Sequence, residues 1–374
     1  MRSSLFSRVS RISGSVALGG LLTLAVAAPA GAAEVTTVAT GLDNPRGLTV
    51  GANGAIYVAE AGRGGDGTCI AAPEGGQQCY GPSGAVTRIL NGKQERIANG
   101  LPSLASEIGS NAIGPHHVAN VAPGVTYVTV GLGADPAVRD QFELENVNFG
   151  QLIQLMPDGK WRSLHDVADY EASTNPDGGV PDSNPYGLLA GPTGWIVADA
   201  GGNALISMPL GAAPTTLAVF PNREIQPSSP TLPNAVIMQS VPTSVGLGPD
   251  GALYVGELTG FPFPTGEARV YRVMPGQEPS VYAEGFTNVV DIAFGTDGNL
   301  YVLEMARDGL LAAMAGGAEP TGRLVRVAPD RTQTTLVTDE LSAPGGLAFG
   351  ADGTLYVTNH STSAGGGEVL RIKL

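Results

Sequence analysis

The sequence is poor in positive charge. Twenty lysines and arginines stand against 34 aspartates and glutamates, which gives a formal net charge of −14 over 374 residues. Nucleic acids and anionic membrane surfaces both require basic patches on a partner, so we expect neither as a ligand. Charged residues make up only 14% of the chain and hydrophobic residues 43%. The chain can therefore bury a full core, which excludes global disorder.

Long hydrophobic runs are missing except near the start of the sequence. There, three arginines precede the apolar stretch Val16–Ala28, which is too short to span a bilayer, and Ala30-Gly31-Ala32 offers a small-residue cleavage site. This pattern predicts a signal peptide over residues 1–32 and a single domain over residues 33–374. We expect an exported, extracellular protein that is free of the membrane after cleavage. An uncleaved membrane anchor is the alternative.

Cysteine is scarce as well. The only two, Cys69 and Cys79, lie in a glycine-rich polar stretch. In an oxidising compartment such a pair forms a local disulfide, which we predict here. A pair of thiolate metal ligands is the alternative, but no further cysteine supports a zinc site.

Established catalytic motifs are also absent from the sequence. It contains no glycine-rich phosphate loop, no Gly-x-Ser-x-Gly elbow and no His-Glu-x-x-His pair. Its spaced acids do not match a calcium-binding EF loop. Any activity must therefore come from residues that the fold brings together.

One pattern recurs six times along the chain. Its clearest copies cover residues 44–60 and 343–359, and each places two short apolar strands around an Asn-Gly or Asp-Gly pair. We expect a two-residue hairpin turn there, because these residues accept the positive φ angles that tight turns demand. The copies align on six positions spaced by 47 to 70 residues: Tyr57, Tyr127, Ile196, Tyr254, Tyr301 and Tyr356.

Two further strands follow each hairpin, for example residues 84–89 and the outer strand Arg96–Leu101. Four strands in each of six repeats predict an all-β fold, a six-bladed β-propeller. The last repeat stops after its third strand, and residues 34–40 can supply the fourth. This N-terminal strand would close the last blade and remove two exposed edges. An open β-solenoid or two β-sandwiches are the alternatives.

Long connections gather at one end of the predicted propeller. The loops into the innermost strands and the loops after the second strands open on the same face, and they carry the insertions, whereas the hairpin turns are short. Long loops over one end of a rigid scaffold commonly bind ligands, so we predict a site at the mouth of the central channel. The alternative is that these insertions have no function and are simply tolerated in surface loops.

Polar side chains are expected to ring this mouth. Those predicted to bind a ligand are Arg46, Glu60, His117, Tyr186, Asp199, Glu257, Asp291, Glu304 and Asn359. His116, His117 and Arg46 are the candidate catalytic residues. Because the two histidines are adjacent in a strand, at most one faces the channel. The acids could instead cap backbone N–H groups, and Arg46 could hold a carboxylate of a neighbouring blade.

The repeats resemble the ScyD/ScyE family of secreted bacterial propellers. The resemblance rests on Gly-Leu-x-x-Pro-x-Gly-Leu, on Asp/Asn-Gly-x-Leu-Tyr-Val-x-Glu and on strands of the form Gly-x-Val-x-Arg-Ile, and it runs from Gly41 to the strand that begins at Gly367. It implies a secreted propeller. The molecular role of the family is poorly defined, so the resemblance adds little about chemistry.

Similar repeats occur in NHL-type propellers, gluconolactonase-like hydrolases, streptogramin lyase-like proteins and quinone-dependent sugar dehydrogenases. A gluconolactonase-like site would hold one divalent ion, such as Ca²⁺ or Mg²⁺, and Glu60, Asp291 and Asn359 match its ligands in type only. A quinone-dependent site would need a histidine base and several cations, and only Arg46 and Arg139 are candidates.

These observations favour a secreted propeller that binds a small ligand or an extracellular protein on its loop-rich face. A divalent-metal-dependent hydrolase of lactones or esters is the alternative, and a quinone-dependent sugar dehydrogenase is a less favoured one. The ligand and any cofactor stay open. Nothing in the sequence points to obligate oligomerisation, so we expect a monomer.

Overall fold

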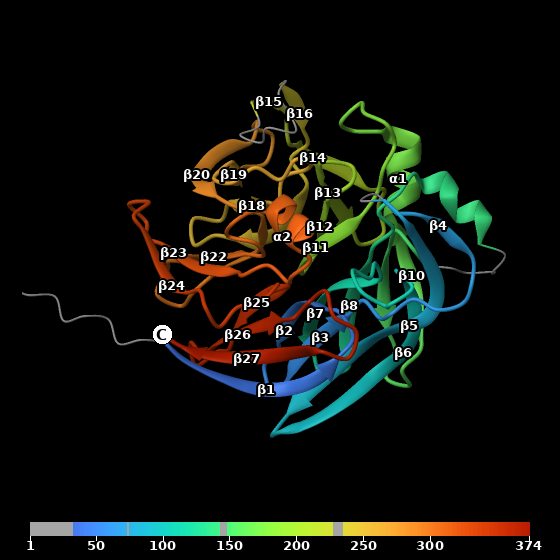
Figure 1. Cartoon of the computed structure of the whole chain (residues 1–374), viewed down its shortest axis with the longest axis horizontal. Coiled ribbons are helices and arrows are strands. Elements are labelled where there is room, and N and C mark those ends of the chain that lie inside the picture. The colour runs from blue at the N-terminus through green and yellow to red at the C-terminus, as the bar shows by residue number, and fades with distance from the viewer. Residues whose placement is uncertain (1–32, 73–74, 143–147, 227–234) are drawn as a thin grey trace, which may run out of the picture. The chain divides into compact units, whose positions relative to one another are not determined.

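The computed structural model describes residues 33–72, 75–142, 148–226 and 235–374. The predicted signal peptide lies outside these residues. The described chain forms six blades of four antiparallel strands (Figure 1), and the innermost strands contact one another in a closed ring. The predicted six-bladed β-propeller is therefore confirmed.

The first three blades follow one another along the chain, each beginning at its innermost strand. Blade 1 contains β2 (Pro45–Val50), β3 (Ile56–Glu60), β5 (Gln77–Leu90) and β6 (Lys93–Ala105). Blade 2 contains β7 (Pro115–Ala122), β8 (Val125–Val130), β9 (Gln151–Leu155) and β10 (Trp161–Asp166). Blade 3 contains β11 (Pro185–Gly191), β12 (Gly194–Asp199), β13 (Ala204–Pro209) and β14 (Thr215–Val219).

The last three blades repeat this order, except that the final blade borrows its outer strand. Blade 4 contains β17 (Pro242–Leu247), β18 (Leu253–Glu257), β19 (Ala268–Val273) and β20 (Ser280–Phe286). Blade 5 contains β21 (Val289–Phe294), β22 (Leu300–Glu304), β23 (Arg323–Val327) and β24 (Gln333–Val337). Blade 6 contains β25 (Gly346–Phe349), β26 (Leu355–Asn359), β27 (Gly367–Lys373) and β1 (Glu34–Leu42).

The closure of blade 6 agrees with the sequence prediction. Strand β1 pairs antiparallel with β27, from Glu34 opposite Lys373 to Leu42 opposite Gly367. Figure 1 shows the two strands side by side, one from each end of the described chain. No strand of blade 6 is therefore missing.

The core lies between blades rather than within them. One cluster joins Tyr57 and Val86 of blade 1 to Val118 of blade 2, and another joins Tyr301 of blade 5 to Val357 of blade 6. Similar clusters occupy the other four interfaces. Each sheet is thus covered on both faces, which explains why strands such as Ile56–Glu60 are buried at every position.

The turns of the inner hairpins differ from the prediction. Five residues, not two, connect β2 to β3 and β17 to β18. Only the glycine of each Asn-Gly or Asp-Gly pair has positive φ, for example 75° at Gly54. The preceding side chain instead accepts a backbone hydrogen bond two residues on, as Asn53 Oδ1 does from Ala55 N at 3.1 Å. This side-chain turn is an alternative use of the same residues.

The insertions add short elements that the repeat does not predict. Strand β4 (Cys69–Ala71) extends blade 1, and β15 (Arg223–Ile225) pairs with β16 (Val236–Met238). The helical pieces are η1 (Pro136–Gln141), α1 (Val167–Thr174) and α2 (Leu310–Gly316). None of the described helices is long and apolar enough to cross a membrane.

The disulfide prediction is confirmed. Cys69 of β4 and Cys79 of β5 lie opposite each other in the antiparallel pair and are bonded. The bond fixes the hairpin of the first long insertion.

Candidate functional site

A cavity of about 320 Å³ occupies the mouth of the central channel. Innermost strands contribute Arg46, His116, Tyr186, Thr243 and Val290 to its wall. The wall is completed by helix α2, by residues 106–113 and by Ala72, Gly75, Gln77 and Gln78 of the disulfide hairpin. This volume lies at the lower end of the range for small-molecule sites. The cavity is therefore built by the long loops, at the place where the sequence predicts a site.

Arg46 is the charged group of this cavity. It is only 9% exposed, and its Nη2 donates to the Ala112 carbonyl oxygen at 2.7 Å. Its Nε is buried and has no hydrogen-bond partner among the described residues. No aspartate or glutamate of the described chain forms an ion pair with it, although the sequence suggested one from a neighbouring blade. A buried guanidinium thus faces the cavity without a counter-ion.

His116 stands next to Arg46 in the cavity wall. Its Nδ1 lies 3.2 Å from the Pro185 carbonyl oxygen, which can only accept, so Nδ1 carries the proton. Burial and the nearby Arg46 charge lower the pKa of His116 to about 3. The ring is therefore neutral near pH 7, and Nε2 keeps a free lone pair.

Tyr186 lies over the His116 ring, with the ring centroids 4.4 Å apart and an interplanar angle of 32°. Burial raises the pKa of Tyr186, and the neighbouring Arg46 charge opposes part of that rise. The phenol is thus protonated at neutral pH and can donate one hydrogen bond. Arg46, His116 and Tyr186 give the cavity one fixed cation, one acceptor and one neutral hydroxyl.

His117 faces the opposite way from His116, as the strand alternation predicts. Its ring packs against Gly47 of blade 1, so closely that a Cβ on that glycine would lie 2.4 Å from His117 Cδ2. Burial lowers the pKa of His117 to about 4. His117 was the histidine predicted to bind the ligand, but the structure places His116 in the cavity wall.

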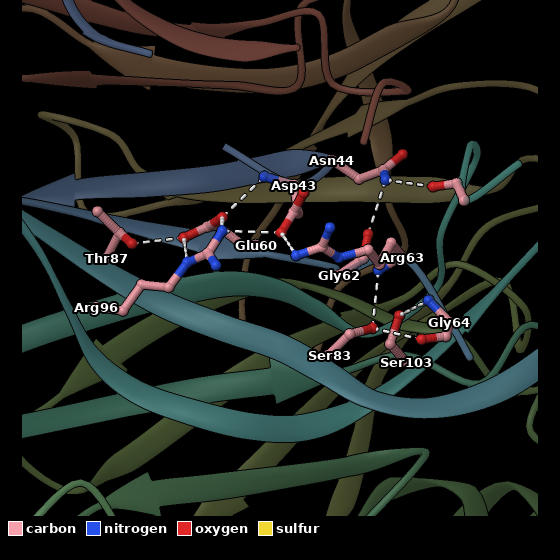
Figure 2. A network of polar contacts seen from close by, with 11 residues as sticks. Asp43, Asn44, Glu60, Gly62, Arg63, Gly64, Ser83, Thr87, Arg96 and Ser103 are labelled. Carbon is pink, nitrogen blue, oxygen red and sulfur yellow. Dashed lines mark hydrogen bonds and ion pairs between the residues drawn. The ribbon is translucent and has the colours of Figure 1, made fainter. Parts of the chain in front are cut away.

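Glu60 serves to brace blade 1 rather than to line the cavity. Figure 2 shows its carboxylate at the centre of a polar network. Oε1 accepts from Thr87 Oγ1 at 2.5 Å and from Arg96 Nε at 3.1 Å. Oε2 accepts from Asp43 N at 2.8 Å and from Arg96 Nη2 at 2.6 Å. Both oxygens are therefore fully used inside the blade.

The same arrangement recurs at the end of the second strand in other blades. Glu304 accepts from Thr287 N and is held by Arg323, and Glu257 accepts from Ser240 Oγ and is held by Arg223. These acids are wholly buried. They tie the loop into the innermost strand to the end of the second strand, which is the capping alternative that the sequence left open.

Two more blades use a related brace without an arginine. Asp199 accepts from Asn184 N at 2.6 Å and Ser183 Oγ at 2.8 Å, and burial raises its pKa to about 6. Asn359 Oδ1 accepts from Ser342 N at 2.8 Å. None of these five second-strand residues belongs to the wall of the channel-mouth cavity.

The predicted metal ligands are not brought together. Glu60, Asp291 and Asn359 belong to blades 1, 5 and 6, and the bonds described above occupy Glu60 and Asn359. Asp291 is 5% exposed and accepts from Ile292 N and Leu347 N, each at 2.8 Å. The described chain also contains no group of three acid, histidine or cysteine side chains arranged around one metal position. A gluconolactonase-like metal does not fit this set.

Arg139 does not add a second cation to the cavity. Its Nη1 lies 2.8 Å from Asp166 Oδ2, so its charge is paired within blade 2. Among the described residues, the quinone-dependent arrangement, which needs several free cations, therefore has only Arg46.

The cavity also has an apolar side, which the repeat pattern does not predict. Val290 of the innermost strand of blade 5, Phe263, and Leu310 and Met314 of α2 form it. The Ala- and Leu-rich stretch Leu310–Gly316 was a usable signal, because an apolar segment in a long insertion is expected to cover something.

Comparisons with known proteins show likeness in fold. No family model matches the chain, and no curated protein matches its sequence. A gluconolactonase of Xanthomonas campestris aligns with a TM-score of 0.54 and 11% identity, over 92% of this chain and 90% of that one. The apo form of a soluble aldose sugar dehydrogenase of Escherichia coli aligns with a TM-score of 0.51 and 13% identity, over 91% and 99%. At these identities the likeness concerns the fold alone.

Proposed function

We propose that this chain binds a small organic acid in the channel-mouth cavity and that Arg46 holds its carboxylate. The observation that carries the proposal is the buried Arg46 guanidinium without a counter-ion. Arginine stays charged in proteins, and an unpaired buried charge is costly. A carboxylate accepts two parallel N–H bonds from a guanidinium, so an acid from solution would satisfy this site.

A hydroxyl on the same ligand fits the neighbouring side chain. His116 Nε2 offers a lone pair, and a ligand O–H can donate to it. With a pKa near 3, His116 is a weak base, so its role is to orient the ligand rather than to take its proton. We therefore propose a hydroxy acid as the ligand class.

The sequence supports a proposal for where the protein acts. We propose that residues 1–32 export the chain and that it acts outside the cell as a ScyD/ScyE-like propeller. The support is the charged, apolar and small-residue order of the first 32 residues and the repeat phrases.

Calorimetric titration tests the ligand class. The probes are lactate, gluconate and tartrate, each compared with its uncharged amide, at up to about 10 mM, where a site with a Kd near 1 mM is nearly filled. We expect at least one acid to bind and its amide to bind at least tenfold more weakly. Equal binding of acid and amide, or no binding by any acid, would contradict the proposal.

Variants of two arginines test the residue assignment. Arg46→Gln should weaken acid binding by roughly 10- to 100-fold, because a hydrogen bond to a charged group contributes about 1.5–3 kcal/mol. Arg46→Lys keeps the positive charge but loses the two-pronged guanidinium, so its affinity for the acid should lie between those of the wild type and Arg46→Gln. Arg139→Gln is the matched control, because Asp166 already pairs with Arg139. If Arg46→Gln binds the acid as tightly as the wild type does, Arg46 does not hold the carboxylate.

Hydrolysis of lactones is the second candidate, and the fold of the Xanthomonas enzyme is its support. The weak basicity of His116 and the bonded state of Glu60 and Asn359 favour binding instead. Incubation with glucono-δ-lactone and Ca²⁺, Mg²⁺, Mn²⁺ or Zn²⁺ distinguishes the two. Metal-dependent hydrolysis that is lost in Asp291→Asn would favour the enzyme.

A further inference from the structure

A buried carboxylate in helix α1 lacks hydrogen-bond partners. Glu171 is wholly buried, and neither Oε1 nor Oε2 accepts a hydrogen bond of normal geometry from the described residues. Among the described residues, the other fully buried glutamates are Glu60, Glu257 and Glu304, and each is held by an arginine. In the described chain, no lysine, arginine or histidine forms an ion pair with Glu171. Its charge is therefore uncompensated by the protein.

The surroundings of Glu171 are acidic. Burial, followed by the charges of Asp199, Asp177 and Asp182, raises the pKa of Glu171 to about 7, and only the Asp182 backbone N–H opposes this. Like charges at close range repel, so this cluster destabilises the fold unless a cation or a proton enters. The residue types here, all with oxygen donors, suit a hard cation.

A second oxygen without a partner lies one helical turn away. Asn175, the left-handed C-cap of α1, donates through Nδ2 to the Gly179 carbonyl oxygen at 2.9 Å, while its buried Oδ1 has no partner among the described residues. Asn175 N donates to the Glu171 carbonyl oxygen at 2.7 Å, so the two residues are neighbours at the C-terminal end of α1. Two residues with buried, unpartnered acceptor oxygens therefore stand at the same end of α1.

Two glycines in the turn after β12 lie against Glu171 and a further acid, Asp182. A Cβ on Gly202 would lie 2.7 Å from Glu171 Oε2, and a Cβ on Gly201 would lie 2.8 Å from Asp182 Oδ1. Both carboxylates therefore pack against this pair of glycines. Asp182 and Gly201 also line a second cavity of about 570 Å³, which shares Asn184 and Phe263 with the channel-mouth cavity. A cation in that cavity can therefore reach Asp182.

We propose that Glu171, Asn175 and Asp182 bind a Ca²⁺ ion beside this second cavity. Two carboxylates, one amide oxygen, and backbone or water oxygens make up the donor set, so the site needs no third acid at the same point. Ca²⁺ accepts such mixed oxygen ligands in irregular geometry, whereas Zn²⁺ favours histidine and cysteine. The site is separate from Arg46 and does not depend on the proposed ligand.

Calorimetric titration of the chelator-treated protein with Ca²⁺ tests the site. We expect one ion per chain with a Kd on the order of 10⁻⁴ M, as in extracellular sites with few acidic ligands, and a rise in Tm with Ca²⁺. Glu171→Gln should weaken binding at least tenfold and abolish the Tm rise. Glu278→Gln, the same change at an exposed position, should leave both intact.

The variant remains informative because its fold is not at risk. Glutamine keeps the shape of Glu171 and removes its charge, so metal-free Glu171→Gln should be at least as stable as the metal-free wild type. No Ca²⁺ binding by the wild type, or equal binding by Glu171→Gln, would overturn the proposal and leave a protonated Glu171 as the explanation. Tighter binding of Zn²⁺ than of Ca²⁺ would overturn the oxygen-ligand assignment.

Discussion

Arg96 of the outer strand β6 holds both carboxylate oxygens of Glu60, which ends the second strand of the same blade. Arg96 Nη2 lies 2.6 Å from Oε2 and Nε lies 3.1 Å from Oε1. The pair thus spans three strands of blade 1 (Figure 2), and Asp43 N joins it to the loop before the innermost strand. Its counterparts in blades 4 and 5 show that this is a repeated brace.

Removal of Arg96 should destabilise the protein strongly. Glu60 is wholly buried, so Arg96→Ala leaves a buried charge without its partner, which costs about 3 kcal/mol. Denaturant unfolding measures this. Arg88→Ala removes the exposed partner of Glu95 on the same blade, and it should change stability by less than about 1 kcal/mol. Equal losses in the two variants would refute the brace.

Asp291 should make stability fall as the pH rises. Burial raises its pKa from 3.8 to about 7 in the folded chain. The folded state therefore retains a proton that the unfolded chain releases between about pH 4 and pH 7, and stability declines over that window by at most about 1.4 kcal/mol per pH unit. Asp291→Asn cannot titrate. Its unfolding free energy, measured from pH 4 to pH 8, should rise relative to the wild type until pH 7 and then stay level. A constant difference would contradict this.

Gly131 should tolerate no side chain, because of its closeness to His116. An added Cβ would lie 2.1 Å from His116 Cε1 and 2.5 Å from Asn184 Oδ1. Gly131→Ala should displace the ring, lower stability by about 1–3 kcal/mol and weaken acid binding. Gly246→Ala is the control, because its Cβ would meet only the Ile292 carbonyl oxygen at 3.9 Å. Unchanged binding in Gly131→Ala would show that His116 does not contact the ligand.

Reduction of the disulfide should loosen the cavity wall locally. Cys69 and Cys79 close a loop of 10 residues, which in the chain-entropy model constrains it by about 2–3 kcal/mol. Ala72, Gly75, Gln77 and Gln78 of this loop belong to the cavity wall. Hydrogen exchange should accelerate in residues 69–79 of the Cys69→Ser, Cys79→Ser protein, and acid binding should weaken. Acceleration throughout blade 1 would mean that the bond supports the whole blade instead.

The architecture could be predicted because its signals are local. Each repeat carries its own turn residues and apolar strands, so the six blades and even the pairing of β1 with β27 could be read before the structure was known. The turn length was wrong, since Asn53 and Asp250 bond to the backbone rather than adopting positive φ. The sequence shows which residues suit a turn. It does not show whether an Asn or Asp there adopts positive φ or accepts a backbone hydrogen bond through its side chain.

The site was predictable only in part. Arg46 and Tyr186 line the channel-mouth cavity because each lies at the start of an innermost strand, a position that the sequence pattern indicates. The role of Glu60 depends on Arg96, which is distant in sequence. The lack of a hydrogen-bond partner at Glu171 is likewise set by residues that are distant in sequence. Hydrogen-bond partners of buried acids come from tertiary structure, so no local pattern reports them.

The single seam between β1 and β27 ties the two ends of the described chain together, and this has a consequence for synthesis. Glu34 pairs with Lys373, so the ring cannot close until synthesis has reached β27. Five blades can assemble as the chain emerges, while the sixth stays incomplete with an open edge. Pairings between residues so far apart are slow to form, because a long loop must close first. We therefore expect the nascent chain to pass through an open state, which the pairing of β27 with β1 converts into a ring.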